Sequence, residues 1–161
     1  MPGYAEDRAR IEDLMARYLF ALDWQDVDAY AATFAEDGVL DWAMGIVTGR
    51  AAIAREAAAM AAAVAARAAL DAPLRPARRR HFVTNLALAI DGDRATARAY
   101  WCELNNDVRD RWPYVAGYGH YEDDLVRDGD GWLFARRRIC NEILAHRAAG
   151  ADNPVGWGAS A

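Results

Sequence analysis

The sequence predicts an α+β domain in which helices come first and an antiparallel sheet follows. In the first part of the chain, apolar residues recur at spacings of three and four, which is typical of helices packed on one face. From residue 81 onward, runs rich in valine, threonine, tyrosine and tryptophan are separated by Asp-Gly turns, which is typical of hairpins. We therefore expect helices to cover one face of a strongly curved sheet and to leave an apolar pocket against it.

The first helix is expected over about residues 6–22, because its apolar positions from Ile11 to Leu22 form one stripe. Asp23 follows Leu19 by one turn, so it continues this buried stripe with a carboxylate. Asp26 is expected to cap a short second helix that has Phe34 on its inner face and is ended by Glu36-Asp37-Gly38.

The next segments are predicted as a short strand over 39–42 and a turn over 45–49. A third, alanine-rich helix is expected to begin at Thr48 or Gly49 and to be stopped by Pro73. Four strands are predicted after it, over residues 81–90, 94–105, 114–127 and 132–142.

Composition excludes several classes of protein. The chain has 161 residues, 54% of them apolar and 27% charged, which indicates one folded domain, here assigned to 1–147 with an irregular tail over 148–161. The formal net charge of −5 gives no indication of a nucleic-acid or membrane partner. All 19 basic residues are arginine, which rules out a catalytic Schiff-base lysine.

The expected location is the cytoplasm. The first ten residues carry charges where a signal peptide would be apolar, and the alanine-rich stretch is interrupted by Arg55, Glu56 and Arg67. Cys102 and Cys140 are too few for a disulfide framework.

The order of several short motifs resembles the NTF2-like superfamily, and within it the SnoaL-like branch. The motifs are Tyr18 to Asp23 at the end of the first helix, Phe34 to Gly38, the Thr48-Gly49-Arg50 turn, and the run from His81 to Asn85. The resemblance covers about residues 6–145. It implies a cone-shaped α+β fold with a pocket, and a homodimer or homotrimer. Within the branch, the chain is similar to scytalone dehydratase, bile acid 7α-dehydratase and hexachlorocyclohexane dehydrochlorinase.

The resemblance also implies a catalytic pair. In those lyases an aspartate ends the first helix and a histidine begins the first long strand, and Asp23 and His81 stand at these positions. Tyr18 corresponds to a tyrosine of the bile acid enzyme. The stretch from 53 to 80 is longer than usual, so the entrance of the pocket is expected to differ.

These residues could carry out an elimination. His81 would remove a carbon-bound proton, Asp23 would orient the imidazole, and Tyr18 would assist the leaving group as an acid. The alternative is that Asp23 only caps a helix end and His81 is a hydrogen-bonded core histidine. The same base could also serve an isomerase, a cyclase or another carbon–carbon or carbon–halogen lyase. A non-catalytic binding module or small subunit is the third possibility.

Further residues are candidates for substrate binding. Four tryptophans could line the pocket, although core packing is the alternative for each: Trp24, Trp42, Trp101 and Trp132. Strand alternation places Asn85 on the face of His81 and predicts that Arg136 and Arg138 point the same way as Trp132 and Phe134. The remaining candidates are Glu103, whose alternative is a solvated rim position, and Arg138.

No cofactor and no metal are predicted. His81, His120 and His146 are too scattered for a metal-binding motif, and His120 is expected to face solvent or another subunit. The sequence therefore favours a cofactor-independent, dehydratase-type lyase acting on a small apolar, aromatic or polycyclic molecule.

Overall fold

The computed structural model describes residues 3–70, 79–107 and 112–156. Its elements, in chain order, are α1 (Tyr4–Trp24), α2 (Val27–Ala32), β1 (Phe34–Trp42), β2 (Gly45–Thr48), α3 (Arg50–Leu70), β3 (Arg80–Asp91), β4 (Arg94–Asn105), β5 (Tyr114–Asp128) and β6 (Gly131–Asn141).

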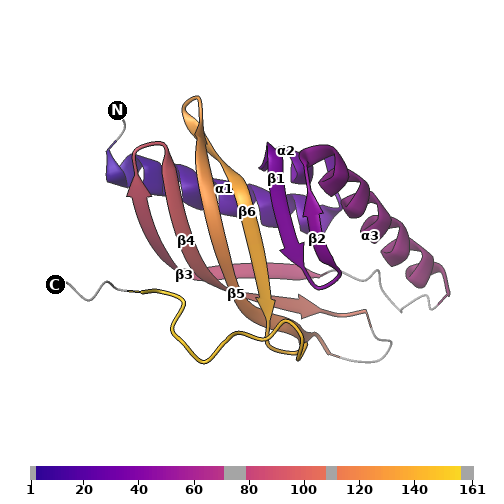
Figure 1. The fold of residues 1–161 in the computed structure, drawn as a ribbon. Coiled ribbons are helices and arrows are strands. Elements are labelled where there is room, and N and C mark those ends of the chain that lie inside the picture. The colour runs from indigo at the N-terminus through magenta and orange to yellow at the C-terminus, as the bar shows by residue number, and fades with distance from the viewer. Residues whose placement is uncertain (1–2, 71–78, 108–111, 157–161) are drawn as a thin grey trace.

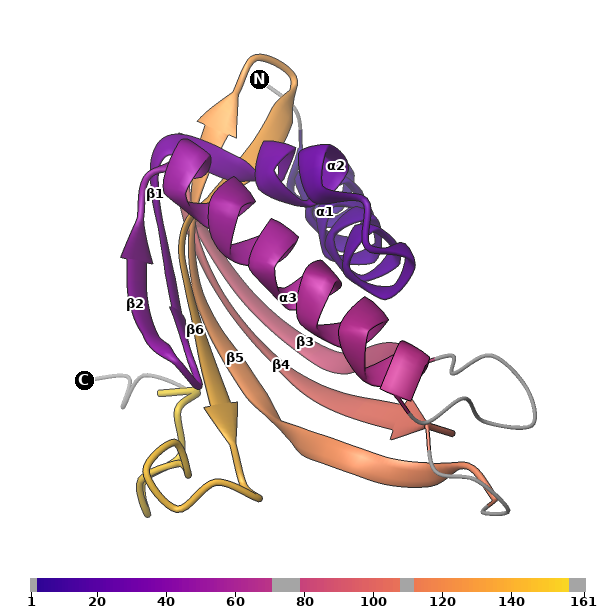
Figure 2. The same cartoon turned by 90° about the vertical axis from the view of Figure 1, so that its right-hand side faces the viewer.

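The strands form one sheet in the order β2-β1-β6-β5-β4-β3. All neighbours are antiparallel except β1 and β6, which run parallel. The sheet curves strongly, and α1 and α3 lie across its hollow side, while none of the described residues forms a helix over the other side (Figures 1 and 2). The predicted α+β fold with helices covering a curved sheet is therefore confirmed.

The segment around Phe34 differs from the sequence prediction. Phe34 begins β1 instead of lying on the inner face of the second helix, which ends at Ala32, and residues 45–48 form an edge strand instead of a turn. Between Phe34 and Val39 the pairing with β6 shifts register. Gly38 allows this close approach, because a Cβ there would lie 3.0 Å from the Phe134 carbonyl oxygen. A short-range pattern could not reveal a parallel partner about 100 residues away.

The core lies between α1 and the hollow face of the sheet. Ile11, Leu14 and Tyr18 of α1 are buried against Tyr121 of β5 and Phe134 of β6. The stripe predicted from spacing is therefore the buried face of α1.

The end of α1 and the start of β3 are brought together at one end of the core. The backbone N–H of His81 donates to Asp23 Oδ2 at 2.9 Å. Gln25 ends the helix in the left-handed conformation (φ 59°), and its N–H bonds back to the last turn. Asp23 is thus held on the last turn of a helix that the cap terminates directly beyond it.

After β6 the chain continues to residue 156 through turns and bends. Arg147 fixes the first part of this segment, because it pairs with Asp41 at 2.8 Å and donates to the carbonyl of Ile139. The tail residue Trp157 and the end of the long segment before β3, residues 71–78, lie outside the described residues. Within the described part of the chain, no helix is long and apolar enough to cross a membrane.

Candidate active site

Asp23 and His81 form a buried, directly bonded pair. The imidazole Nδ1 lies 2.6 Å from Asp23 Oδ1, and the other oxygen of the same carboxylate accepts the backbone N–H of His81. Both side chains are more than nine-tenths buried. This bidentate arrangement fixes the orientation of the ring, so that Nδ1–H donates to Asp23 and Nε2 points away from it.

A second carboxylate faces the other nitrogen of His81. Glu103 Oε2, on the neighbouring strand β4, lies 3.5 Å from Nε2. Burial lowers the pKa of His81, but the hydrogen bonds and negative charges of Asp23 and Glu103 outweigh it and raise the pKa above its ordinary value. The protonated form of the ring is therefore stabilised from both sides.

His81 lines a cavity of about 180 Å³ between α1, α3 and the hollow face of the sheet. His81 and Glu103 line it together with Trp42, Trp101 and Tyr18. The remaining lining residues are Leu22, Tyr30, Leu40, Ala43, Met60, Arg79, Tyr121, Ile139 and Asn141. The wall is mostly apolar with few polar groups, which is the composition of a small-molecule site.

Tyr18 reaches the cavity from the buried stripe of α1. Its side chain is 1% exposed, and its hydroxyl lies 3.1 Å from that of Tyr30. Burial raises the pKa of Tyr18, although the nearby Arg137 guanidinium acts in the opposite direction. The phenol therefore keeps its proton at neutral pH and can donate it.

The indole of Trp101 forms part of the cavity wall next to His81. Its Nε1–H donates to the Cys140 carbonyl at 3.0 Å, and its ring stacks on Tyr121. Gly117 makes room for the ring, because a Cβ there would lie 3.1 Å from it. Trp42 and Trp101, two of the tryptophans predicted to line the pocket, therefore do line the cavity, and they leave it open.

Trp24 lies outside the cavity, contrary to the prediction that it lines the pocket. It is 58% exposed, stacks on Phe20, and has the Arg80 guanidinium 4.0 Å above its ring. Asp23 faces the core at the end of α1, and the next position of the helix is rotated by about 100° toward solvent. Trp132 also misses the cavity, since it is buried against Asp7.

Two β-bulges displace the other mispredicted residues. Pairing of β3 with β4 shifts between Thr84 and Ala87, and Asn85 adopts φ 58° with an exposed side chain. Alternation from His81 therefore stops before Asn85, which does not line the cavity.

The second bulge lies in β6, where pairing with β5 shifts between Asp124 and Leu125. Because of this shift, Arg137 shares the buried face with Phe134, and Arg138 is 44% exposed on the outer face, where it pairs with Glu122. The expected common orientation of Arg138 and Phe134 is therefore wrong, and Arg138 does not reach the cavity.

Arg79, Asn141 and Met60 line the cavity although sequence reasoning did not select them. Arg79 carried a usable signal, since it stands two positions before His81. Met60 lies in the alanine-rich helix, whose weak periodicity gave no indication of its inner face. Asn141 ends β6, beyond the bulge that changes the phase of that strand.

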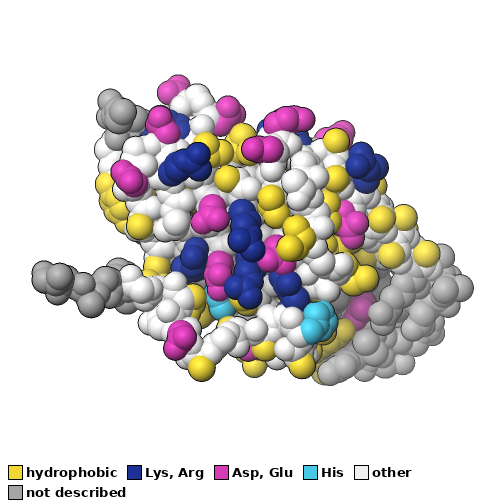
Figure 3. Space-filling model, viewed as in Figure 1, with side chains coloured by type: hydrophobic (Ala, Val, Ile, Leu, Met, Phe, Trp, Pro, Cys, Tyr) yellow, Lys and Arg dark blue, Asp and Glu magenta, His cyan; other side chains and the backbone are white. Residues whose placement is uncertain are grey.

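One group on the opposite side of the sheet has metal-ligand chemistry. His120 Nε2 lies 3.1 Å from Glu122 Oε1, and the Cys140 thiol lies 3.8 Å from the same oxygen. His120 is buried in this group, whereas the sequence suggested solvent or a subunit contact. Arg138 already pairs with Glu122, so a cation there would meet an existing positive charge. Figure 3 shows basic and acidic side chains interspersed at the centre of this outer face.

Comparison with known proteins agrees with the fold. The family model of the SnoaL-like domain matches residues 3–138. No curated protein matches. Among solved structures, the chain is similar to Rv3472 of Mycobacterium tuberculosis, described as a protein of unknown function (30% identity over 90% of this chain and 82% of that one, TM-score 0.70).

Two further structures have the same fold. One is an NTF2-like protein with a cystatin-like fold from Novosphingobium aromaticivorans (26% identity, 83% of this chain and 80% of that one, TM-score 0.67). The other, also from Novosphingobium aromaticivorans, is named provisionally as a scytalone dehydratase (23% identity, 94% of each chain, TM-score 0.67). With a family model that spans most of its length, this chain belongs to the SnoaL-like domain family of the NTF2-like superfamily.

Proposed function

We propose that the protein is a lyase of the dehydratase type, in which His81 removes a proton from a carbon atom of a small, largely apolar substrate. The observation that carries the proposal is the buried Asp23–His81 pair, 2.6 Å apart, whose histidine lines an open cavity together with Glu103, the carboxylate that faces its second nitrogen. Elimination moves one proton and one leaving group, so it requires no electron carrier and we propose no cofactor.

Four polar side chains have separate tasks in this proposal: His81, Asp23, Glu103 and Tyr18. Neutral His81 accepts the proton at Nε2, and the imidazolium that forms is stabilised by Asp23 on one side and Glu103 on the other. Tyr18 donates its phenolic proton to the departing hydroxide, so that water leaves. The aromatic walls of Trp42 and Trp101 suit a flat aromatic or polycyclic substrate.

A structural role for the pair is less consistent with the geometry. A helix cap or a core histidine needs no cavity beside it, whereas here about 180 Å³ remains open next to Nε2. A non-catalytic module would also have no need for a second carboxylate, Glu103 of β4, at the histidine. The relative named provisionally as a scytalone dehydratase shows the fold only, so the chemistry rests on the dyad.

The test is a substrate panel of β-hydroxy carbonyl compounds, hydroxylated aromatics and steroids, followed by mass spectrometry for loss of water. Turnover by the wild type that collapses in His81→Ala and Asp23→Asn, both folded by circular dichroism, is the expected result. His146→Ala is the matched control, because His146 is exposed and bonds only to the Ala43 carbonyl. Turnover that persists in both dyad variants would rule the mechanism out.

An isomerase or cyclase using the same base is the second candidate, favoured by the same histidine and cavity. Reactions in D₂O separate the two. An elimination removes water from the substrate, so the product is lighter by one water, whereas an isomerase keeps the substrate's composition and introduces deuterium only in the presence of His81.

We also propose that copies of the chain associate through the outer face of the sheet. Phe82, Tyr100 and Tyr118 are about half exposed there, on three adjacent strands. Sedimentation of the wild type should give a dimer or trimer, and Tyr100→Arg should shift it toward the monomer. A monomeric wild type would contradict this proposal.

A further inference from the structure

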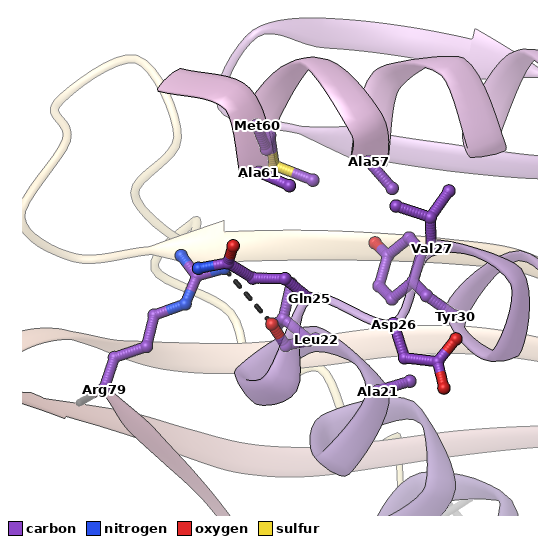
Figure 4. A pocket seen from close by; sticks show the side chains of 10 residues that line it. All are labelled: Ala21, Leu22, Gln25, Asp26, Val27, Tyr30, Ala57, Met60, Ala61 and Arg79. Atoms are coloured by element: carbon purple, nitrogen blue, oxygen red, sulfur yellow. Dashed lines mark hydrogen bonds between the residues drawn. The ribbon is translucent and has the colours of Figure 1, made fainter. Parts of the chain in front are cut away.

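Arg79 stands at the junction of the catalytic cavity and a smaller crevice. It lines both, together with Leu22, Tyr30 and Met60. The crevice lies between the end of α1, the start of α2 and the middle of α3, with room for about one water molecule (≈ 10 Å³). In Figure 4 the Arg79 side chain extends toward the Leu22 carbonyl at the end of α1, with Gln25 on the same wall and Met60 on the helix across from it.

The hydrogen bonding of this guanidinium is incomplete. One terminal nitrogen donates to the Leu22 carbonyl at 3.3 Å, and the enclosed Nε has no partner. Among the described residues, no carboxylate forms an ion pair with Arg79. Arg127, Arg137 and Arg147, which are also partly or fully buried, pair with Asp7, Asp123 and Asp41. Arg98 resembles Arg79 in having an enclosed Nε without a partner, but it donates to the carbonyls of Ala97 and Asp123 and does not line the cavity.

A half-buried cation without an anion is unfavourable, because the protein does not replace the water it has lost. Trp42, which lines the same cavity, has a second donor without a partner, because its enclosed Nε1 makes no hydrogen bond. Both groups are donors. A ligand that satisfies them must therefore carry acceptor oxygen atoms.

We propose that Arg79 binds a carboxylate of the substrate, so that the protein acts on a small aromatic or polycyclic carboxylic acid. This assignment rests on the function proposed above and specifies its substrate class. The carboxylate would lie at the junction and the ring system in the wider cavity between Trp42 and Trp101. Arginine binds a carboxylate through two parallel N–H donors, which matches the free donors of Arg79.

Charge favours a carboxylate over an enolate oxygen. Arg79 is charged before any reaction begins, so its partner must be an anion in the bound ground state, whereas an enolate forms only during turnover. Glu103 repels the same carboxylate from the histidine side, so the two charges orient the substrate along the cavity.

The experiment compares matched ligands that are not turned over. Benzoate, 1-naphthoate and 2-naphthoate are titrated calorimetrically against the wild type, alongside their methyl esters, which keep the shape and lose the charge. We expect at least one acid to bind about 10- to 100-fold tighter than its ester. Arg79→Gln should abolish this preference. Arg80→Gln is the control, because the Arg80 guanidinium lies over Trp24 outside the cavity and should keep the preference.

The outcomes separate this inference from the proposed function. Equal binding of acid and ester, no binding by any probe, or a preference that survives Arg79→Gln would each overturn the carboxylate assignment. The calorimetry requires no turnover, so Asp23→Asn should still prefer the acid. The wild type could prefer the acid and Arg79→Gln could lose this preference while turnover does not depend on the dyad. That combination would support the carboxylate assignment and reject the lyase.

Discussion

The hollow face of the sheet holds two buried pairs of a carboxylate and a cationic or protonatable group, and they differ in what surrounds them. Arg137 and Asp123 form a bidentate ion pair at 2.7 and 2.8 Å, fully buried, with the rings of Tyr18, Tyr121 and Phe134 about 4 Å from the guanidinium carbon. Asp23 and His81 are almost as buried, but Nε2 of the histidine borders a cavity.

The difference shows which property makes a buried pair a candidate for catalysis. Arg137 remains protonated throughout the accessible pH range, and its side chain is fully enclosed by other protein groups. His81 has a titratable ring whose pKa, against the effect of burial, is raised above the ordinary value by Asp23 and Glu103, and the residue lines an open cavity. Burial and charge are common to both pairs, so titration and access are what distinguish them.

The largest effect should come from Asp23→Asn. The amide cannot stabilise the imidazolium as a carboxylate does, so kcat should fall about 100- to 10,000-fold once a substrate is known. The unfolding temperature should change little, since the amide keeps one hydrogen bond to His81. Asp13→Asn, an exposed change on the same helix, is the control for activity. A loss of activity explained entirely by unfolding would mean that Asp23 has a structural role, like the Arg137–Asp123 pair.

Arg137→Met should have the opposite pattern, with a large effect on stability. It leaves the Asp123 carboxylate buried without its partner, which costs about 3–5 kcal/mol of unfolding free energy. Combining it with Asp123→Leu removes the second charge and should restore most of the loss. Urea unfolding of the two single variants and the double variant measures this. A double variant less stable than both single ones would mean that the ion pair is itself stabilising.

Local patterns in the sequence predicted the elements that depend on local physics. The α1 stripe, the four long strands and their Asp-Gly turns follow from spacing and turn chemistry. Asp23 was noticed because a carboxylate continued an apolar stripe. The structure brings it to His81, as the family resemblance implied, and adds Glu103 on the neighbouring strand.

Asn85 and Arg138 were mispredicted for one cause, which is a change of phase that alternation cannot anticipate. Asn85 lies in a β-bulge and Arg138 follows one, and a single extra residue moves every later side chain to the other face. Arg137 was missed as a core residue for the same reason. Arg79 was missed because its place depends on how the end of α1 meets the start of β3, a tertiary contact between distant segments.

The pH dependence of activity should show a moderate effect that distinguishes the titratable His81 from the permanently charged Arg137. A base must be neutral, and the pKa of His81 is raised, so kcat/KM should increase with pH through a pKa above the ordinary histidine value. Glu103→Gln removes one of the two charges that stabilise the protonated ring and should move the rise about one pH unit lower. Glu142→Gln, on the exposed segment after β6, should leave the profile in place. Activity that falls with rising pH would mean that His81 acts as an acid.

The smallest effect is expected at a third pair, Asp7 with Arg127, which is partly open to solvent. The hydrogen bond from Arg127 lowers the pKa of Asp7 to about 2, against the effect of burial. A depressed carboxylate pKa stabilises the fold above the unfolded-state value near 4, and this contribution is lost as pH falls toward 2. Urea midpoints measured from pH 6 to pH 2 should therefore drop less steeply in Asp7→Asn than in the wild type, from a lower starting value. Parallel curves would show that Arg127 does not stabilise the ionised carboxylate, and Asp13→Asn controls for the loss of a negative charge on α1.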